Sequence, residues 1–306
     1  MITNDVTDIS PSTQHDDGLW ISTYYRGIEY LDITSGQFTH YNKNTVPGLP
    51  CEQTWTVLDG GDGNLYIGHV GSGFSILSLK DKSVKNFRNE AGNPMSLPGN
   101  DVFCIIKDTN GNIWLGTNKG LALYNAANEN FITFKKNKND KYDTLCSRIL
   151  SIRQLKDNKL WIASELNGIA ILNLKQSMFL SPEEISLEYI QEGDDSRSLS
   201  NASARCIFQD SFDNIWIGTW GGGINFISSK SPLFTTLSYS PIPNNENSLN
   251  NKVASSLCMD RQGRVWIGTD GGGINVFEGE KRTAIYKKES GDIPSNFILA
   301  SLQDSK

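Results

Sequence analysis

Asn214-Ile215-Trp216-Ile217-Gly218-Thr219 is one of six similar segments that recur along a chain of 306 residues. The segments are Gly18–Thr23, Asn64–His69, Asn112–Thr117, Lys159–Ser164, Asn214–Thr219 and Arg264–Thr269. Their aromatic residues stand at positions 20, 66, 114, 161, 216 and 266, which are 46, 48, 47, 55 and 50 residues apart. A repeat of roughly 40 to 50 residues with about four strands per unit is typical of propeller blades. The sequence therefore predicts an all-β propeller built from four-stranded antiparallel blades.

Each repeat contains a glycine shortly after the aromatic anchor, at the start of a second apolar run. The glycines are Gly27, Gly73, Gly120, Gly168, Gly223 and Gly273. Glycine adopts a positive φ angle without strain, so this position predicts a tight hairpin between the second and third strands of each blade.

The remaining two strands of a blade are visible on either side of this hairpin. An apolar run that ends at an Asp-led polar turn precedes the anchor, as in Val102–Asp108 and Ala204–Asp210. A weaker, more polar run follows the third strand, as in Phe38–Tyr41, Phe131–Phe134 and Phe234–Leu237. Inner strands that are apolar on both faces fit blades sandwiched between neighbours.

The repeats divide the chain into one propeller region, 1–306, with a partial unit at its end. The boundaries lie near 1–45, 46–95, 96–143, 144–198, 199–248 and 249–293, and 294–306 is interpreted as the first strand of a seventh blade. Two arrangements fit this pattern. The chain is a piece of a longer, seven-bladed propeller, or the terminal strand closes a six-repeat ring against the first unit, because an unpaired inner strand leaves an exposed edge.

Composition excludes several other classes of protein. The formal net charge is −6, which argues against a nucleic-acid surface. No apolar run approaches the length of a membrane span, and no basic-then-apolar signal segment opens the chain. With 38% hydrophobic residues, the chain can bury a substantial core.

The five cysteines predict no disulfide framework. Cys104 and Cys206 occupy equivalent places in alternate repeats, and so do Cys51 and Cys146. Equivalent positions in alternate blades lie too far apart for a bond that needs Cα atoms within about 7 Å. We interpret the cysteines as small buried hydrophobic residues.

No catalytic or metal-binding motif is recognisable. The histidines His15, His40 and His69 form no metal-spaced pair. The segment Asp59–Asn64 resembles a calcium loop but lacks the glutamate at the twelfth position, and Gly221–Gly223 and Gly271–Gly273 are hairpins without a following helix. Asp194 and Asp195 are adjacent in a loop, so their side chains diverge. We expect no catalytic residue, no metal and no cofactor.

A binding surface is expected on one rim of the propeller. The connections between the second and third strands share this rim with the long connections between blades. Exposed Trp, Tyr and Arg side chains dominate binding surfaces, and aromatic rings stack on sugar faces. The predicted ligand or partner residues on this rim are Tyr24, Tyr25, Arg26, His69, Trp220 and Asp270.

The repeat consensus resembles a known family. Units of the form Asp-x-x-Gly-Asn-Ile-Trp-Ile-Gly-Thr-x-x-Gly-Gly-Ile-Asn, with a leader such as Ser248–Val253, are similar to the regulator-propeller repeats of bacterial hybrid two-component sensors. The resemblance covers nearly the whole chain and is strongest in units three, five and six. It implies seven-bladed propellers in a periplasmic sensor region, followed by an immunoglobulin-like domain, a membrane span and a histidine kinase. Many members of this family respond to oligosaccharides.

Three classes of function are compatible with these features. The first is a non-catalytic, periplasmic sensor fragment whose candidate partners are an oligosaccharide, an adjacent propeller or immunoglobulin-like domain of the same receptor, and a second copy of the chain. The second is a protein-interaction scaffold. The third is a propeller lyase or glycan hydrolase, which needs histidines or paired carboxylates at the channel mouth. The scattered histidines favour the first two.

Overall fold

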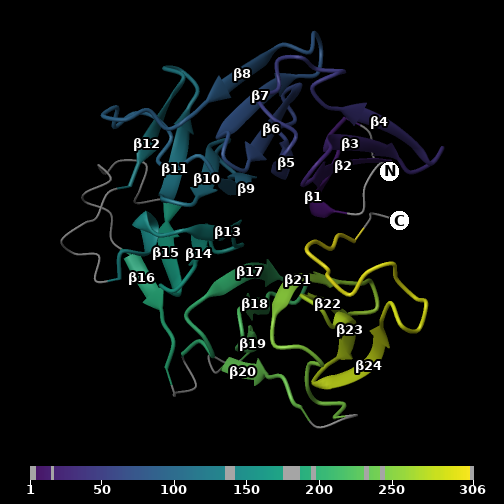
Figure 1. Cartoon of the computed structure of the whole chain (residues 1–306). Coiled ribbons are helices and arrows are strands. Elements are labelled where there is room, and N and C mark those ends of the chain that lie inside the picture. The colour runs from purple at the N-terminus through teal and green to yellow at the C-terminus, as the bar shows by residue number, and fades with distance from the viewer. Residues whose placement is uncertain are drawn as a thin grey trace.

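The computed structural model describes residues 5–14, 17–134, 142–174, 187–193, 198–230, 234–241 and 245–303. These residues form six four-stranded antiparallel sheets that follow one another around a ring, as predicted (Figure 1). They contain almost no helix, apart from short segments such as the 3-10 turn η1 (Thr144–Cys146). No helix in the described part of the chain is long and apolar enough to span a membrane. The Asp194–Asp195 pair and His15 lie outside the described residues.

Every blade is a simple meander, whose strands we call a, b, c and d in chain order. Blade 1 consists of β1 (Val6–Pro11), β2 (Gly18–Thr23), β3 (Gly27–Asp32) and β4 (Gln37–Tyr41). Blade 2 consists of β5 (Thr54–Asp59), β6 (Asn64–His69), β7 (Phe74–Ser78) and β8 (Val84–Phe87). Blade 3 consists of β9 (Val102–Lys107), β10 (Ile113–Thr117), β11 (Gly120–Asn125) and β12 (Asn130–Thr133).

The other three blades repeat this order. Blade 4 consists of β13 (Ile149–Gln154), β14 (Lys159–Ser164), β15 (Ile169–Asn173) and β16 (Leu187–Ile190). Blade 5 consists of β17 (Ala204–Gln209), β18 (Ile215–Thr219), β19 (Gly223–Ile227) and β20 (Phe234–Leu237). Blade 6 consists of β21 (Ala254–Met259), β22 (Val265–Thr269), β23 (Gly273–Glu278) and β24 (Lys281–Tyr286).

The predicted hairpin glycines close the turns between strands b and c. All six have a positive φ angle, for example 78° at Gly223. A Cβ atom at Gly223 would lie only 2.5 Å from the carbonyl oxygen of Leu237 in strand d. Both the backbone angle and the close approach therefore exclude a larger residue at this position.

An aspartate fixes the turn between strands a and b in blades 3, 5 and 6, and it is buried in blades 3 and 5. In blade 5, the Asp210 carboxylate accepts hydrogen bonds from the backbone amides of Phe212 and Asn214 and, at 3.0 Å, from Trp216 Nε1. Asp108 and Asp260 accept the same indole hydrogen bond in blades 3 and 6, each at 2.9 Å. The motif Asp-x-x-Gly-Asn-Ile-Trp thus encodes a turn and the orientation of its anchor.

Blade 4 lacks this aspartate. Leu155 occupies the equivalent position, and no described residue accepts a hydrogen bond from Trp161 Nε1. This accounts for the weaker match of the fourth repeat to the consensus.

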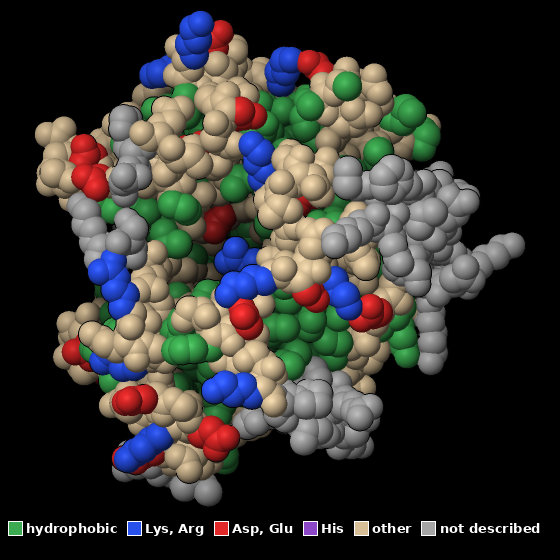
Figure 2. Space-filling view, turned by 180° about the vertical axis from the view of Figure 1, so that it is seen from behind, with side chains coloured by type: hydrophobic (Ala, Val, Ile, Leu, Met, Phe, Trp, Pro, Cys, Tyr) green, Lys and Arg blue, Asp and Glu red, His purple; other side chains and the backbone are tan. Residues whose placement is uncertain are grey.

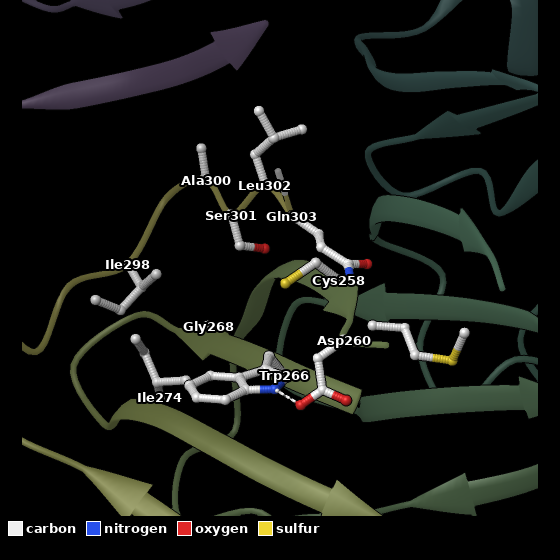
Figure 3. Close-up of a pocket in the computed structure, with 11 residues that line it drawn as sticks. Cys258, Asp260, Trp266, Gly268, Ile274, Ile298, Ala300, Ser301, Leu302 and Gln303 are labelled. Atoms are coloured by element: carbon white, nitrogen blue, oxygen red, sulfur yellow. Dashed lines mark hydrogen bonds between the residues drawn. The ribbon is translucent and has the colours of Figure 1, made fainter. Parts of the chain in front are cut away.

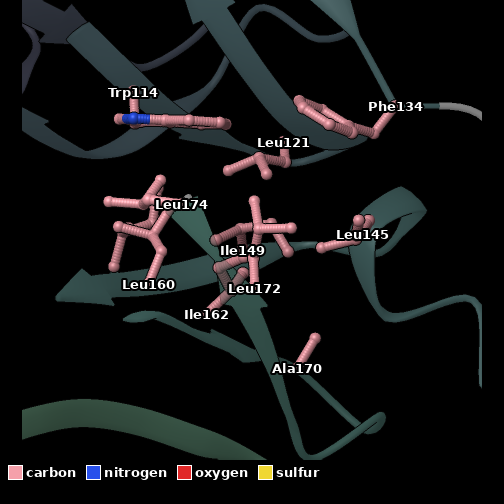
Figure 4. Packing of buried hydrophobic residues seen from close by; sticks show 11 residues of the cluster. Trp114, Leu121, Phe134, Leu145, Ile149, Leu160, Ile162, Ala170, Leu172 and Leu174 are labelled. Atoms are coloured by element: carbon pink, nitrogen blue, oxygen red, sulfur yellow. The ribbon is translucent and has the colours of Figure 1, made fainter. Parts of the chain in front are cut away.

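The hydrophobic core is divided among the boundaries between neighbouring blades. Figure 4 shows the boundary between blades 3 and 4, where Trp114, Leu121 and Phe134 face Leu160 and Leu172. Comparable clusters lie between blades 1 and 2, 2 and 3, 4 and 5, and 5 and 6. Because each anchor is covered by the next blade, the anchors of blades 1 to 5 are at most 7% exposed. Trp266 of blade 6 is only partly buried.

The segment after blade 6 occupies the place of a further inner strand. In blades 1, 2, 4 and 5 the amide of the hairpin glycine donates to a carbonyl just before the next inner strand, as in Gly223 to Lys252 at 3.3 Å. Gly273 donates in the same way to Asn296, at 2.9 Å, and Ile298 N donates to Thr269 O at 3.0 Å. In Figure 1 this segment lies on the same side of the ring as β1, but these hydrogen bonds join it to blade 6.

The prediction that this segment forms a regular strand is wrong. Its pairing is limited to one isolated bridge, between Phe297 and Asp270. An inner strand pairs with strand b of its own blade, and the described residues contain no such partner beyond blade 6. A cavity of about 350 Å³ lies beside Trp266, lined by Ile274 and Ile298 among other residues (Figure 3). At each of the five boundaries between neighbouring blades, a packed hydrophobic cluster fills the equivalent space. We therefore interpret the cavity as incomplete packing against blade 6.

None of the five cysteines forms a disulfide, as predicted, but all five are half-buried rather than buried. Burial raises the pKa of Cys104 to about 12 and that of Cys206 to about 11, so both thiols are protonated at neutral pH.

We expect all five thiols to react with a thiol reagent after denaturation without reductant. In the native protein at pH 8, Cys104 and Cys206 should react far more slowly than in the denatured protein, because the thiolate is the reactive form. Thiol titration with and without denaturant measures both quantities. The loss of two reactive thiols in the denatured sample would instead reveal a disulfide.

Candidate functional site: an arc of aromatic and arginine side chains at the channel mouth

The rim predicted to carry the binding surface is a repeating structure. In each blade the residue that follows strand b donates its backbone N–H to the residue just before strand a of the same blade, at 2.9 or 3.0 Å. The six residues at this position are Tyr24, Val70, Asn118, Glu165, Trp220 and Asp270. They therefore lie on one face of the ring, which we call the b–c rim. The prediction that these connections share one rim is confirmed.

Every inner strand carries a β-bulge near this rim. The strand register slips by one residue at Thr7, Trp55, Phe103, Leu150, Arg205 and Ser255. A bulge removes one residue from the ladder and redirects its side chain. Thr7 Oγ1 donates to Thr54 O of the next inner strand at 3.1 Å, and Ser255 Oγ donates to Ile298 O in the segment after blade 6.

Aromatic rings from the first three blades touch one another along this rim. The ring of Tyr25 packs against Tyr24 at 4.6 Å between centroids, and Tyr24 lies 6.3 Å from Trp55. Trp55 in turn packs edge-on against Phe103 at 5.5 Å. The contacts join the b–c hairpin of blade 1 to the bulges of blades 2 and 3.

Arginines continue the arc through blades 4 and 5. The guanidinium of Arg148 lies 4.9 Å from the Phe103 ring centroid and forms an ion pair with Glu165 at 3.1 Å. The guanidinium of Arg205 lies 4.6 Å from the ring centroid of Trp220, which is 45% exposed. We call Tyr24, Tyr25, Trp55, Phe103, Arg148, Arg205 and Trp220 the mouth arc. Figure 2 shows that the molecule is hollowed near its centre, with Lys and Arg side chains beside the hollow.

Five of the predicted rim residues belong to this surface or border it. Tyr25 is 56% exposed and Trp220 is 45% exposed, while Tyr24 is partly buried between its neighbours. Asp270 holds in blade 6 the position that Trp220 holds in blade 5. Arg26 is exposed on the same hairpin as Tyr25.

His69 differs from the prediction. It ends β6 at this rim, but its side chain is fully buried and therefore offers no exposed ring. Its Nε2 atom lies 2.8 Å from Ser75 Oγ, and its Nδ1 atom lies 3.5 Å from Cys51 Sγ. Burial lowers the pKa of His69 to about 4, so the neutral ring is a poor base for the thiol of Cys51.

Sequence reasoning missed Trp55, Phe103, Arg148 and Arg205. Trp55, Phe103 and Arg205 lie within runs interpreted as apolar inner strands, where side chains were expected to pack between blades. The signal that could have found these three is the wide variation at the second position of strand a, from threonine to tryptophan to arginine. Among the described residues, no group of three His, Cys, Asp or Glu side chains is placed to hold a metal ion.

Comparison with known proteins identifies the repeats. The family model of the two-component regulator propeller matches residues 96–119, 198–221 and 248–271. These segments include the anchors of blades 3, 5 and 6, where the consensus is strongest. These three segments are two-component regulator propeller repeats.

Two relatives place this regulator propeller in larger proteins. The whole chain is 61% identical to 36% of the extracellular domain of a proposed hybrid two-component system, BT3049, from B. thetaiotaomicron, with a TM-score of 0.65. A stretch of 94 residues, 29% of the chain, is 33% identical to part of histidine kinase P4 from Formosa agariphila and spans 7% of that protein. The chain therefore covers about a third of the first relative and a small part of the second.

A third protein shares the fold alone. PorZ, a surface component of the type-IX secretion system of Porphyromonas gingivalis, is 18% identical over 98% of the regulator propeller and 44% of its own chain, with a TM-score of 0.72.

Proposed function

We propose that this regulator propeller is a non-catalytic, periplasmic sensor part of a hybrid two-component receptor and that it recognises oligosaccharides released by glycan breakdown at the b–c rim. The similarity over the full chain to part of the extracellular domain of such a system supports the receptor assignment. A sensor needs contacts that differ between two receptor states and no chemical step.

The observation that carries the choice of surface is the chain of contacts from Tyr25 to Arg148 across blades 1 to 4, beyond which the Arg205–Trp220 pair of blade 5 lies on the same rim. Exposed aromatic rings supply flat apolar faces, and arginines supply directed hydrogen-bond donors. Such a surface suits a ligand that is both apolar on its faces and polar at its edges, as a sugar ring is. A ligand seated there also touches several blades at once, which offers a means of changing their relative positions.

We expect the propeller to bind some neutral oligosaccharide weakly, with a dissociation constant on the order of 1 mM, or about −4 kcal/mol. Calorimetric titration of the wild type with a panel of plant and microbial glycans measures this affinity. Replacing both Trp220 and Tyr25 by alanine should abolish the signal, because it removes the two most exposed rings of the mouth arc.

Other results would support a different function. Oligosaccharide binding that survives the double replacement would locate the site elsewhere. A co-purifying protein that is lost with these two rings, without any oligosaccharide binding, would favour the scaffold function. Cleavage of any glycan in the panel would place the protein among the enzymes.

A further inference from the structure

Arg205 and Trp220, at one end of the mouth arc, and the neighbouring Asp270 extend from backbone segments that are hydrogen-bonded to one another. Trp220 and Asp270 hold equivalent positions in blades 5 and 6. Val253 pairs with Trp220 in an antiparallel bridge, and the Val253 carbonyl accepts the Asp270 N–H at 3.0 Å. The N–H of Trp220 donates to Ser203, two residues before Arg205, at 2.9 Å. These contacts set Arg205, Trp220 and Asp270 side by side.

Arg205 packs its guanidinium against the ring of Trp220, and the N–H groups of that guanidinium remain available to a ligand. Its guanidinium stacks 4.6 Å from the indole centroid, while the ring remains 45% exposed and so offers surface to a ligand. No described residue accepts a hydrogen bond from this guanidinium. Burial lowers the pKa of Arg205, whereas the carboxylates of Asp270 and Glu165 oppose that shift. A guanidinium carries five N–H donors, and leaving them without hydrogen-bond acceptors at a half-buried position costs free energy.

The charges around this place are balanced. Arg148 is already paired with Glu165, and Arg205 lies within the electrostatic influence of Asp270 without forming an ion pair with it in the described structure. Two cations and two anions leave no net local charge to attract an ion, and the whole chain carries −6. Sugar hydroxyl groups both donate and accept, so they can satisfy a free guanidinium and a free carboxylate together.

We propose that Arg205, Trp220 and Asp270 form a subsite for one neutral hexose unit, with the sugar ring stacked on Trp220, Arg205 donating to its hydroxyl oxygens and Asp270 accepting from its hydroxyl groups. The proposal rests on the glycan-recognition function proposed above and names the part of the b–c rim that sets its specificity.

Two series of hexasaccharides test this proposal. Neutral β-linked glucose, mannose and galactose hexamers form one series, and galacturonate and chondroitin hexamers form the acidic series. The dissociation constants are measured by NMR, from the ¹⁵N-labelled indole signals of the tryptophans, with the Trp220 signal assigned from Trp220→Phe. At least one neutral hexamer should shift the Trp220 signal and bind about tenfold more tightly than either acidic hexamer.

Single substitutions then separate the three roles. Trp220→Ala and Arg205→Met should each weaken binding of that neutral hexamer by about tenfold, and Asp270→Asn by about fivefold, in keeping with the loss of a stacking partner or a charged hydrogen bond. Arg205→Lys keeps the charge but loses the planar fork, so it should weaken binding nearly as much as Arg205→Met. The matched control is Phe212→Ala, because Phe212 is 66% exposed but lies at the a–b turn on the opposite rim of the same blade.

Each result has a separate meaning. If Tyr25→Ala abolishes binding of the neutral hexamer but the substitutions of Arg205, Trp220 and Asp270 leave it unchanged, the subsite is overturned. The proposed function of the b–c rim is then retained. Tighter binding of an acidic hexamer would overturn the neutral class of ligand. An absence of binding to all hexamers would overturn both the subsite and the glycan-recognition function. An equal loss in Phe212→Ala would show that the variants act through folding.

Discussion

Replacing Trp216 by alanine is expected to lower the free energy of unfolding by about 3 to 5 kcal/mol, whereas the same change at Trp266 should cost about 1 to 2 kcal/mol. Both indoles donate a hydrogen bond to the aspartate six residues earlier, at 3.0 and 2.9 Å. The loss of that bond is therefore common to both variants. The difference arises because Trp216 is 6% exposed beneath blade 6, while Trp266 faces the partly filled cavity.

Urea denaturation followed by circular dichroism measures both free energies. The sequence alone predicts equal costs for the two anchors, since they occupy the same position of the repeat. Equal costs would therefore show that Trp266 is packed as fully as Trp216 in solution. A cost below 1 kcal/mol at Trp216 would contradict its assignment to the core.

Replacing Asp210 by alanine is expected to cost roughly 3 kcal/mol. The change removes one acceptor from four groups at once: the amides of Phe212 and Asn214, the side chain of Asn214 and the indole of Trp216. Asp210 is 4% exposed, so water cannot readily replace the carboxylate. Asp210→Asn keeps one side-chain oxygen as an acceptor and should be milder.

Asp157→Ala provides the control for this prediction. Asp157 stands in the a–b turn of blade 4, is exposed, and accepts one described hydrogen bond, from the amide of Lys159. We expect a cost below about 1 kcal/mol there. If Asp210→Ala proves as mild as Asp157→Ala, the aspartate turn is not what orients the anchor.

The blade architecture could be predicted because its signals are local. A hairpin glycine such as Gly223 is required by a single backbone angle and one close carbonyl, and both recur in every blade. In blades 3, 5 and 6 the side chain of the aspartate that opens the a–b turn bonds to groups no more than six residues away, among them the indole of the anchor. Interactions of such short range repeat with the sequence and can be read from it.

The binding surface was only partly predictable. Trp220 and Tyr25 were found because their positions in the b–c hairpins leave both side chains exposed. Arg205 and Trp55 were missed because a strand position looks buried until a bulge turns its side chain out of the ladder. The bulge arises from the pairing of strands a and b, and no residue type within the inner strand marks it.

For His69 and the segment 296–298, the local sequence suggested a feature that the tertiary structure does not have. The hairpin position of His69 suggested exposure, yet Ser75 and Cys51 enclose its ring. The apolar pattern around Ile298 suggested a strand, yet a strand needs a paired neighbour, and among the described residues Ile298 bonds only to blade 6.

The sequence by itself determined the repeat, the four strands of each blade, the hairpin and aspartate turns and the rim on which the connections emerge, since each of these depends on residues a few positions apart. Only the tertiary structure decided which side chains meet across blades. The contacts of Trp55 with Phe103 and of Arg148 with Phe103 join residues from different repeats, and the partial exposure of Trp266 depends on what packs against blade 6. The spacing of residues within one repeat carries no information about such contacts, because the curvature of the ring sets the distance between one blade and the next.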